Sequence, residues 1–171
     1  EMTEDIDLFI KNMVKSGFFS EEEMLVGLRN FVEYNYEDYF SKLKSKQLPS
    51  ILSLYNEIYS NKKEPVNFRK LDAAFNQLTQ NGFVAKHAIG NTDDEGFEEC
   101  KDEAIERIDK GEDMVGCCFY TLQALFDMFE NESNQLLLSY GNFHDTPDAV
   151  EVGNCICTQL KEAGFEVIWN K

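Results

Sequence analysis

Two histidines, His87 and His144, are the only side chains in this chain that ordinarily act as bases near neutral pH. His144 lies in the polar run Gly141–Thr146, next to Asp145, in a loop expected to leave a strand. His87 falls inside a predicted strand, where we expect a packed structural role. Catalysis would also need a nucleophile and a group that orients the base. His144 is therefore the histidine to examine for a site.

The residues that follow the predicted strands suggest where such a site would form. In open parallel sheets, ligands bind in crevices beyond the carboxyl ends of the strands. We expect one such crevice, faced by Asn91 and by five candidate ligand-binding residues: Tyr120, Gln123, Asn142, His144 and Asp145. The alternative is that Asp145 and Thr146 cap the next helix and that His144 is an ordinary exposed loop residue.

Motifs for a metal or a cofactor are missing. The five cysteines contain no C-x-x-C pair, and we expect reduced thiols, with the adjacent Cys117 and Cys118 buried as small apolar groups. Asn91–Gly96 resembles the start of a calcium loop, but a strand precedes it and its first position is Asn. No glycine-rich phosphate loop, G-x-S-x-G or H-E-x-x-H sequence occurs. We therefore expect neither metal nor cofactor.

Acidic charge is the strongest bulk feature, with 32 Asp and Glu against 16 Lys and Arg and a net charge of -16. Residues 93–113 alone hold eleven carboxylates, which predicts a solvated surface helix whose thin apolar edge is Phe97, Ile105 and Ile108. This charge repels nucleic acid and anionic membranes at long range. It serves either solubility or the binding of a basic protein.

A locally basic stretch instead suggests contact with nucleic acid. Residues 41–70 hold seven Lys or Arg against two Glu, and the following helix and Asn81-Gly82-Phe83 resemble the passage from helix to wing in a winged helix. Lys62, Lys63, Arg69 and Lys70 would then contact phosphates. The net charge of the whole chain argues against nucleic acid as the partner.

The last third of the chain predicts the sheet that must position these residues. Apolar runs at 114–119, 135–141 and 165–169 alternate with helical patterns at 122–129 and 147–163, and 83–89 adds a fourth run. Thr146 is the expected N-cap of the 147–163 helix, with Pro147 at its first position. Parallel strands need crossovers of this length. The fold class is therefore α/β, with N-terminal helices before a small, mainly parallel sheet of about four strands and crossover helices.

The first third predicts helices. Apolar spacing indicates helices over 4–16, over 24–32 after a capping box at Ser20–Glu23, and over 48–59. Tyr34, Tyr36, Tyr39 and Phe40 form an aromatic cluster that we expect to be buried. The polar run 60–65 suggests a boundary, giving a helical part at 1–62 and an α/β domain at 63–171, together one compact unit. Neither a membrane span nor a signal peptide is recognised, so we expect a cytoplasmic protein.

A frame of residues from about Leu71 to the end resembles a bacterial family of uncharacterised domains. It comprises Leu71-x-x-Ala74-Phe75-x-x-Leu78, Gly116-x-x-Phe119-Tyr120, Leu136-x-Leu138-Ser139-Tyr140-Gly141, Val152-Gly153 and Leu160-x-x-Ala163-Gly164-Phe165-x-Val167-x-Trp169. Members of that family often carry a cysteine cluster after the first strand and a histidine with Gln-Asp after the second. Here the first position reads His87–Asn91, and the second keeps only Gln123. The resemblance implies the fold and no activity.

Three functions fit these residues. The first is a non-enzymatic protein-binding domain whose acidic surface at 93–113 meets a basic protein. The second is a small-molecule-binding protein or small enzyme that uses the crevice near Tyr120, Gln123 and His144. The third is a winged-helix-like nucleic-acid binder. A deep polar cavity beside His144 would favour the second over the first.

Overall fold

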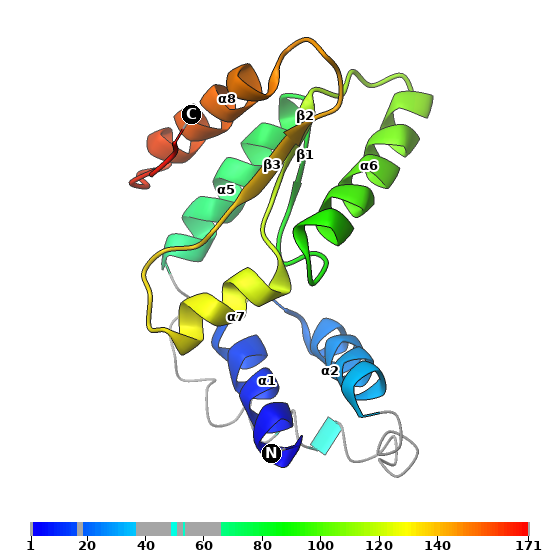
Figure 1. Ribbon diagram of the computed structural model, residues 1–171, viewed down its shortest axis with the longest axis vertical. Helices are drawn as coiled ribbons and strands as arrows, with labels where there is room; N and C mark the ends of the chain where they lie inside the picture. The colour runs from blue at the N-terminus through cyan, green and yellow to red at the C-terminus, as the bar shows by residue number, and fades with distance from the viewer. Residues whose placement is uncertain (1, 17–18, 37–48, 51–52, 54–65, 171) are drawn as a thin grey trace. The chain divides into compact units, whose positions relative to one another are not determined.

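The computed structural model describes residues 2–16, 19–36, 49–50, 53 and 66–170 (Figure 1). The chain separates into two compact units, residues 1–65 and 66–171, and each is described here by itself. The boundary expected near residue 62 falls in 54–65, outside the described residues, and stays a prediction. The described helices include none that is both long and apolar enough to cross a bilayer.

Two packed helices make up most of the described part of the first unit. They are α1 (Met2–Ser16) and α2 (Glu21–Asn35). The rings of Phe9 and Phe31 stack with centroids 4.3 Å apart, and the apolar stripes of both helices supply the buried side chains Phe9, Ile10, Met13, Met24, Leu28 and Val32. The capping box at the start of α2 is confirmed, because Ser20 and Glu23 each bond the other's backbone N–H.

Only part of the remaining N-terminal prediction can be compared with the structure. Most of the third predicted helix, at 48–59, lies outside the described residues, as do two members of the aromatic cluster, Tyr39 and Phe40. Tyr36 is described: it is half-buried, and its hydroxyl bonds the Asp5 carboxylate of α1. This aromatic side chain therefore ties the end of α2 to the start of α1.

A three-stranded mixed sheet forms the centre of the second unit. Its strands are β1 (Phe83–Lys86), β2 (Gly116–Phe119) and β3 (Ser139–Asn142), in the order β1-β2-β3. The β1–β2 pair is parallel and the β2–β3 pair is antiparallel. The expectation of about four mainly parallel strands was wrong on both points.

The position of α7 (Leu122–Glu130) explains why β3 is antiparallel. A parallel neighbour requires the connecting helix to run back along the sheet before the next strand begins. Here α7 lies beyond the end of the sheet where β2 stops, and Ser139 pairs with Phe119 at that same end (Figure 1). The chain therefore enters β3 from the end at which it left β2.

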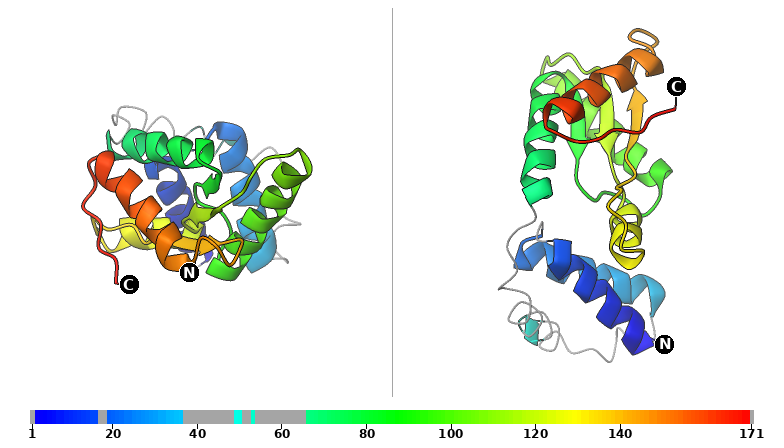
Figure 2. Two further views of the ribbon diagram at one scale, coloured as in Figure 1. Left: turned by 90° about the horizontal axis from the view of Figure 1, so that it is seen from above. Right: turned by 90° about the vertical axis from the view of Figure 1, so that its left-hand side faces the viewer.

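Helices cover both faces of this sheet (Figure 2). On one face, α6 (Asp93–Asp109) packs its small residues Gly96, Cys100 and Ala104 over the strands, and the buried cluster there includes Val84, Cys117 and Phe119. On the other lie α5 (Val66–Gln80) and α8 (Ala149–Glu162), which contact each other as well as β1 and β3 respectively. Cys117 and Cys118 are both fully buried, as expected.

Two local predictions in this unit were wrong. Residues 165–169 form no strand, and the sheet ends at β3. The N-cap of α8 is Asp148, not Thr146, because its carboxylate accepts the Glu151 N–H. On α6, Ile105 and Ile108 are 57% and 43% exposed, since the close approach of the sheet selects small residues for the buried stripe.

Candidate functional site

The five predicted ligand-binding residues do not meet in one crevice. Tyr120 and Gln123 follow the carboxyl end of β2, whereas Asn142 ends β3 and His144 and Asp145 follow it. Because β3 is antiparallel, Asn142 pairs with Gly116, the first residue of β2, at the opposite end of the sheet. The shared crevice required a parallel β3 and is absent from this unit. Ligand binding by either group stays a prediction.

Within the two groups, the side chains have different surroundings. Tyr120 is fully buried, whereas Gln123 is exposed and donates to Asp127 one turn further along α7 (2.8 Å). Asn142 donates to the backbone carbonyl of His144 (2.6 Å), which fixes the turn after β3. His144 and Asp145 are exposed.

A hollow of about 640 Å³ lies beside His144, but one loop alone lines it. Its walls are the consecutive residues Asn142, Phe143, His144 and Asp145. Ligand sites of this volume usually enclose most of a ligand between several elements. A single loop forms an open surface depression. This hollow is therefore not the deep polar cavity that would favour a small-molecule-binding function.

The histidine that makes the best-defined polar contacts is His87, directly after β1. Its Nδ1 lies 2.9 Å from the Tyr120 hydroxyl, and its Nε2 lies 3.2 Å from Oδ1 of Asp72 on α5. The Phe75 ring stacks on the imidazole at 4.6 Å between centroids, and Phe68 approaches at 5.1 Å. Carboxylate, imidazole and phenol thus form one connected line across three segments.

Electrostatics fix the direction of these hydrogen bonds. Burial raises the pKa of the Tyr120 hydroxyl, so the phenol keeps its proton and donates to Nδ1. Burial lowers the pKa of His87, and this outweighs the Asp72 carboxylate, which raises it. The ring is therefore neutral at pH 7, with its proton on Nε2 directed at Asp72.

This line of groups is not arranged for nucleophilic catalysis. The Tyr120 hydroxyl belongs to a fully buried side chain and cannot reach a substrate. Both imidazole nitrogens of His87 are already engaged, and only 22% of its side chain is exposed. A general base must reach the proton that it abstracts. The geometry instead suits a structural or proton-sensitive role.

The backbone around His87 is strained and tightly connected. Ala88 has a φ of +49°, a left-handed conformation that costs an alanine about 1–3 kcal/mol. Ile89 N–H donates to the Tyr120 carbonyl (3.1 Å), and Leu122 N–H donates to the Gly90 carbonyl (3.2 Å). We call this pair of reciprocal bonds the 89–122 clasp. It joins the segments that follow the two parallel strands, which is where ligand sites of such sheets also lie.

Sequence reasoning missed this cluster because its members are far apart in the chain. Asp72 and His87 are separated by fifteen residues, and His87 and Tyr120 by thirty-three. One signal was present: Phe68, Asp72 and Phe75 share one face of a helix, which places a carboxylate among aromatic rings. A charged residue in that position calls for a polar partner.

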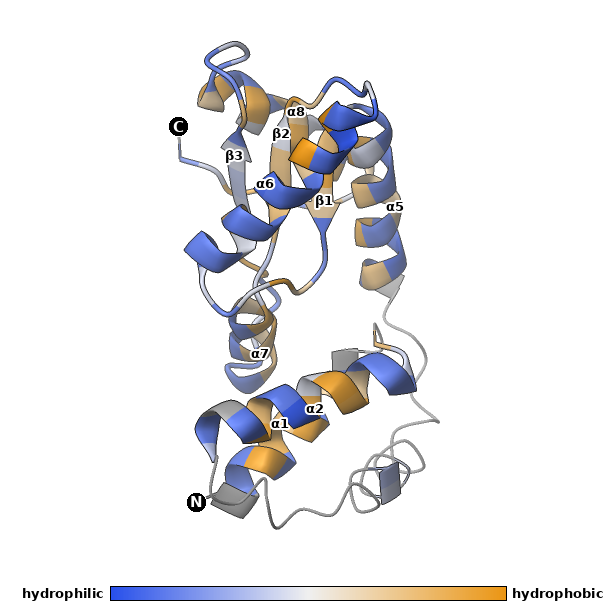
Figure 3. Ribbon diagram, turned by 90° about the vertical axis from the view of Figure 1, so that its right-hand side faces the viewer, coloured by the Kyte–Doolittle hydropathy of each residue, from blue (hydrophilic) through white to orange (hydrophobic). Residues whose placement is uncertain are grey.

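The outward face of α6 is largely hydrophilic (Figure 3). Three of its basic neighbours are engaged locally: Lys101 pairs with Glu98, Lys86 with Glu103, and Arg107 with Glu112. Lys110, the C-cap of α6, is exposed and forms no ion pair with any described residue. Six exposed carboxylates have no hydrogen bond or ion pair with any described residue: Asp94, Glu99, Asp102, Glu106, Asp109 and Asp113. We call these six carboxylates, five on α6 and Asp113 in the segment that follows it, the α6 acidic face.

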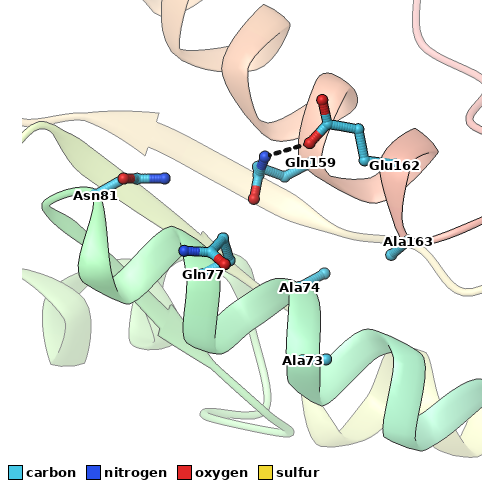
Figure 4. A pocket seen from close by; sticks show the side chains of 7 residues that line it. All are labelled: Ala73, Ala74, Gln77, Asn81, Gln159, Glu162 and Ala163. Carbon is cyan, nitrogen blue, oxygen red and sulfur yellow. Dashed lines mark hydrogen bonds between the residues drawn. The ribbon is translucent and has the colours of Figure 1, made fainter.

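A groove of about 410 Å³ runs between α5 and α8 (Figure 4). It is lined by Ala73, Ala74, Gln77, Asn81, Gln159, Glu162 and Ala163. Gln159 donates to Glu162 within α8 (2.8 Å), as the dashed line shows. Methyl groups and amides dominate the lining, so the groove contains neither a nucleophile nor a base other than one paired carboxylate.

Two further sequence hypotheses lose their structural basis. Asn91–Gly96 is no calcium loop, because Thr92 caps α6 and Asp93–Gly96 form its first turn. The strand after α5 is no wing: β1 continues through α6 into a parallel partner, whereas a wing returns in an antiparallel hairpin. Among the described residues, no group of three His, Cys, Asp or Glu side chains is placed to hold a metal.

Comparison with known proteins bears on the family and not on the activity. No curated protein and no solved structure matches the chain. One family model does match, over residues 1–171, so the likeness extends well beyond the last hundred residues on which it was first seen. The chain therefore belongs to the family described as a domain of unknown function, DUF6891.

Proposed function

We propose that this chain is a non-enzymatic protein-binding domain whose α6 acidic face receives a basic partner protein. The observation that carries the proposal is the set of six exposed carboxylates that no described cation neutralises. Lysine and arginine side chains of a partner would supply the missing charges.

Exposed apolar groups within this face strengthen the case. Ile105 is 57% exposed and lies one helical turn from both Asp102 and Asp109. Ile108 adds a second apolar contact on the same side. Protein interfaces commonly place apolar side chains at the centre of a charged rim. The carboxylates would accelerate association, and the isoleucines would slow dissociation.

The test compares two variants with the same net charge. The first, Asp102→Asn/Glu106→Gln/Asp109→Asn, removes three charges from the α6 acidic face. The second, Glu22→Gln/Glu33→Gln/Glu166→Gln, removes three exposed charges elsewhere. Each tagged protein would capture partners from a lysate of the source cells. Any partner identified by mass spectrometry would then be purified and titrated by calorimetry at 50 and 300 mM NaCl.

We expect a basic partner whose affinity falls at least tenfold in the first variant and less than twofold in the second. Affinity for the unmodified protein should also fall with salt, because exposed charges are screened. A partner that binds both variants equally, or binds independently of salt, would exclude the α6 acidic face as the interface.

A second candidate function rests on the hollow beside His144. Asn142, His144 and Asp145 all line it and offer an amide, an imidazole and a carboxylate to a small polar molecule. The probe would be a set of common amino acids, sugars and nucleosides at 5 mM, with amide chemical shifts of residues 142–145 recorded by NMR. Shifts that occur in the unmodified protein and not in His144→Ala would support this function.

A further inference from the structure

His87 lies at the base of the 89–122 clasp. The imidazole bonds the side chain of Tyr120, while the carbonyl of Tyr120 accepts the N–H of Ile89, two residues after the histidine. Between them, Ala88 holds its left-handed φ of +49°. A strained backbone of this kind persists only while its surroundings hold it in place. The imidazole contacts therefore help to keep the clasp closed.

Protonation of the ring changes what these contacts can do. A neutral imidazole accepts at Nδ1 and donates at Nε2, which matches the Tyr120 hydroxyl and the Asp72 carboxylate. An imidazolium donates at both nitrogens, so the Tyr120 proton loses its acceptor. A buried hydroxyl without an acceptor is unfavourable, and so is a charge against the rings of Phe68 and Phe75 in a largely buried site.

We propose that His87 is a proton-operated latch: its neutral ring holds the 89–122 clasp closed, and its protonation in mildly acidic conditions releases the clasp. The lowered pKa of His87 agrees with this arrangement, because it means that the closed form prefers the neutral ring. Once protonated, the ring is more stable in water than in its largely buried site, which favours opening of the clasp.

Among the described residues, α5, β1 and the segment after β2 bring charged and titratable groups near the ring. Helix α5 contributes Asp72, which also accepts from Asn76, and the segment after β2 contributes Tyr120. On β1 itself, Lys86 pairs with Glu103 on the α6 side of the sheet. Of these described groups, Asp72 is the charged one in direct contact with the imidazole, and it opposes release by favouring the imidazolium in place.

Release would affect α7 most directly. Tyr120 precedes Thr121, the N-cap of α7, whose hydroxyl accepts the Ala124 N–H, and Leu122, the first residue of the helix, makes one of the two clasp bonds. Opening the clasp frees the start of α7 from the β1 side while the β1–β2 ladder stays paired. The latch therefore couples external pH to the attachment of one helix.

The experiment measures the clasp and the ring separately, by NMR on the full chain. Long-range ¹⁵N spectra follow the two imidazoles from pH 4.5 to 8.0, and His144→Gln identifies the His87 signals. Hydrogen exchange gives protection factors for the Ile89 and Leu122 amides, corrected for the intrinsic pH dependence of exchange. We expect both protection factors to fall at least tenfold as His87 protonates, and the Cys118 amide in β2 to change less than threefold.

Two variants make the result specific. His87→Gln keeps one acceptor and one donor without titrating, so its clasp should stay closed across the pH range. Asp72→Asn removes the charge that favours the imidazolium, so the His87 titration and the opening should move together to lower pH. If the His87→Gln clasp opens as in the unmodified protein, or if His87 protonates with the Ile89 and Leu122 protection unchanged, the latch is excluded.

Discussion

Gly96 of α6 lies directly against the Phe119 ring of β2. A Cβ at position 96 would sit 2.3 Å from Cε2 of Phe119 and within 3.0 Å of two further ring atoms. Phe119 is itself fully buried beneath the helix, so its ring has little room to move. The missing side chain is what allows α6, with its acidic outer face, to approach the sheet this closely.

Gly96→Ala should therefore destabilise the second unit, although alanine is the better helix former. Overpacking of a filled core costs about 1–3 kcal/mol, against a gain in helix propensity of at most about 1 kcal/mol. Urea denaturation followed by circular dichroism measures the difference. Gly27→Ala in α2 is the control, because its Cβ would meet the flexible end of Met13 at 3.0 Å and Cζ of Phe9 at an ordinary contact distance of 3.8 Å. Equal effects in the two variants would contradict this explanation.

The second prediction concerns Trp169, the only tryptophan in the chain. Its ring fills the space above Gly153 of α8, where a Cβ would come within 2.4 Å of it, and it packs edge-on against Tyr140 of β3 at 6.0 Å. Gly153→Ala should displace the indole into water and shift its fluorescence emission to longer wavelength. Asn154→Ala changes an exposed neighbour on the same helix and should leave the emission unchanged.

The third prediction concerns the N-cap of α8, for which the structure and the sequence indicate different residues. Asp148 accepts the Glu151 N–H (2.9 Å) and Glu151 accepts the Asp148 N–H (3.0 Å), which completes a capping box. Asp148→Ala should lower the free energy of unfolding by about 0.5–2 kcal/mol, as the loss of an N-cap does. Thr146→Ala should have no measurable effect. The opposite ranking in urea denaturation would place the cap where the sequence suggested.

Local features of this chain could be predicted, and those that depend on distant contacts could not. The box at Ser20 and Glu23 was recognised because both partners lie within one turn. The direction of β3 was not, because it depends on where α7 packs after β2 ends. The predicted crevice was wrong for the same reason, since it required Asn142 and Tyr120 at the same end of the sheet.

The same dependence on distant contacts explains why residues 165–169 were wrongly predicted to form a strand and why the contact of His87 with Asp72 was missed. Residues 165–169 form a short, mainly apolar run that predicts a strand. Phe165, Val167 and Trp169 are half-buried, whereas Glu166 and Ile168 are exposed. Side-chain packing of Trp169 on Gly153, rather than a hydrogen-bonded ladder, anchors this segment. His87 was assigned a structural role from its strand position. Its partner Asp72 belongs to another helix, which no local pattern connects to it.

The final prediction is the pH dependence of stability that His87 confers. Burial lowers the pKa of His87 in the folded protein below its unfolded value of about 6.5. The unfolded chain therefore binds the proton more readily, and unfolding becomes easier as pH falls. The contribution of the neutral ring is complete above about pH 6.5 and is lost progressively as pH falls toward the folded pKa. Burial has the largest effect on the pKa of His87, so it determines the direction of this pH dependence even though the Asp72 carboxylate raises the pKa.

Urea denaturation of the unmodified protein, His87→Gln and His144→Gln at pH 5.5 and 7.5 isolates this contribution. Every variant will lose some stability in acid, because many carboxylates also titrate, so the comparison between variants carries the information. We expect His87→Gln to lose less stability between pH 7.5 and 5.5 than the unmodified protein, and His144→Gln to lose the same amount. A His87→Gln variant that loses more would reverse the sign and show that the folded state prefers the charged imidazolium, held by Asp72.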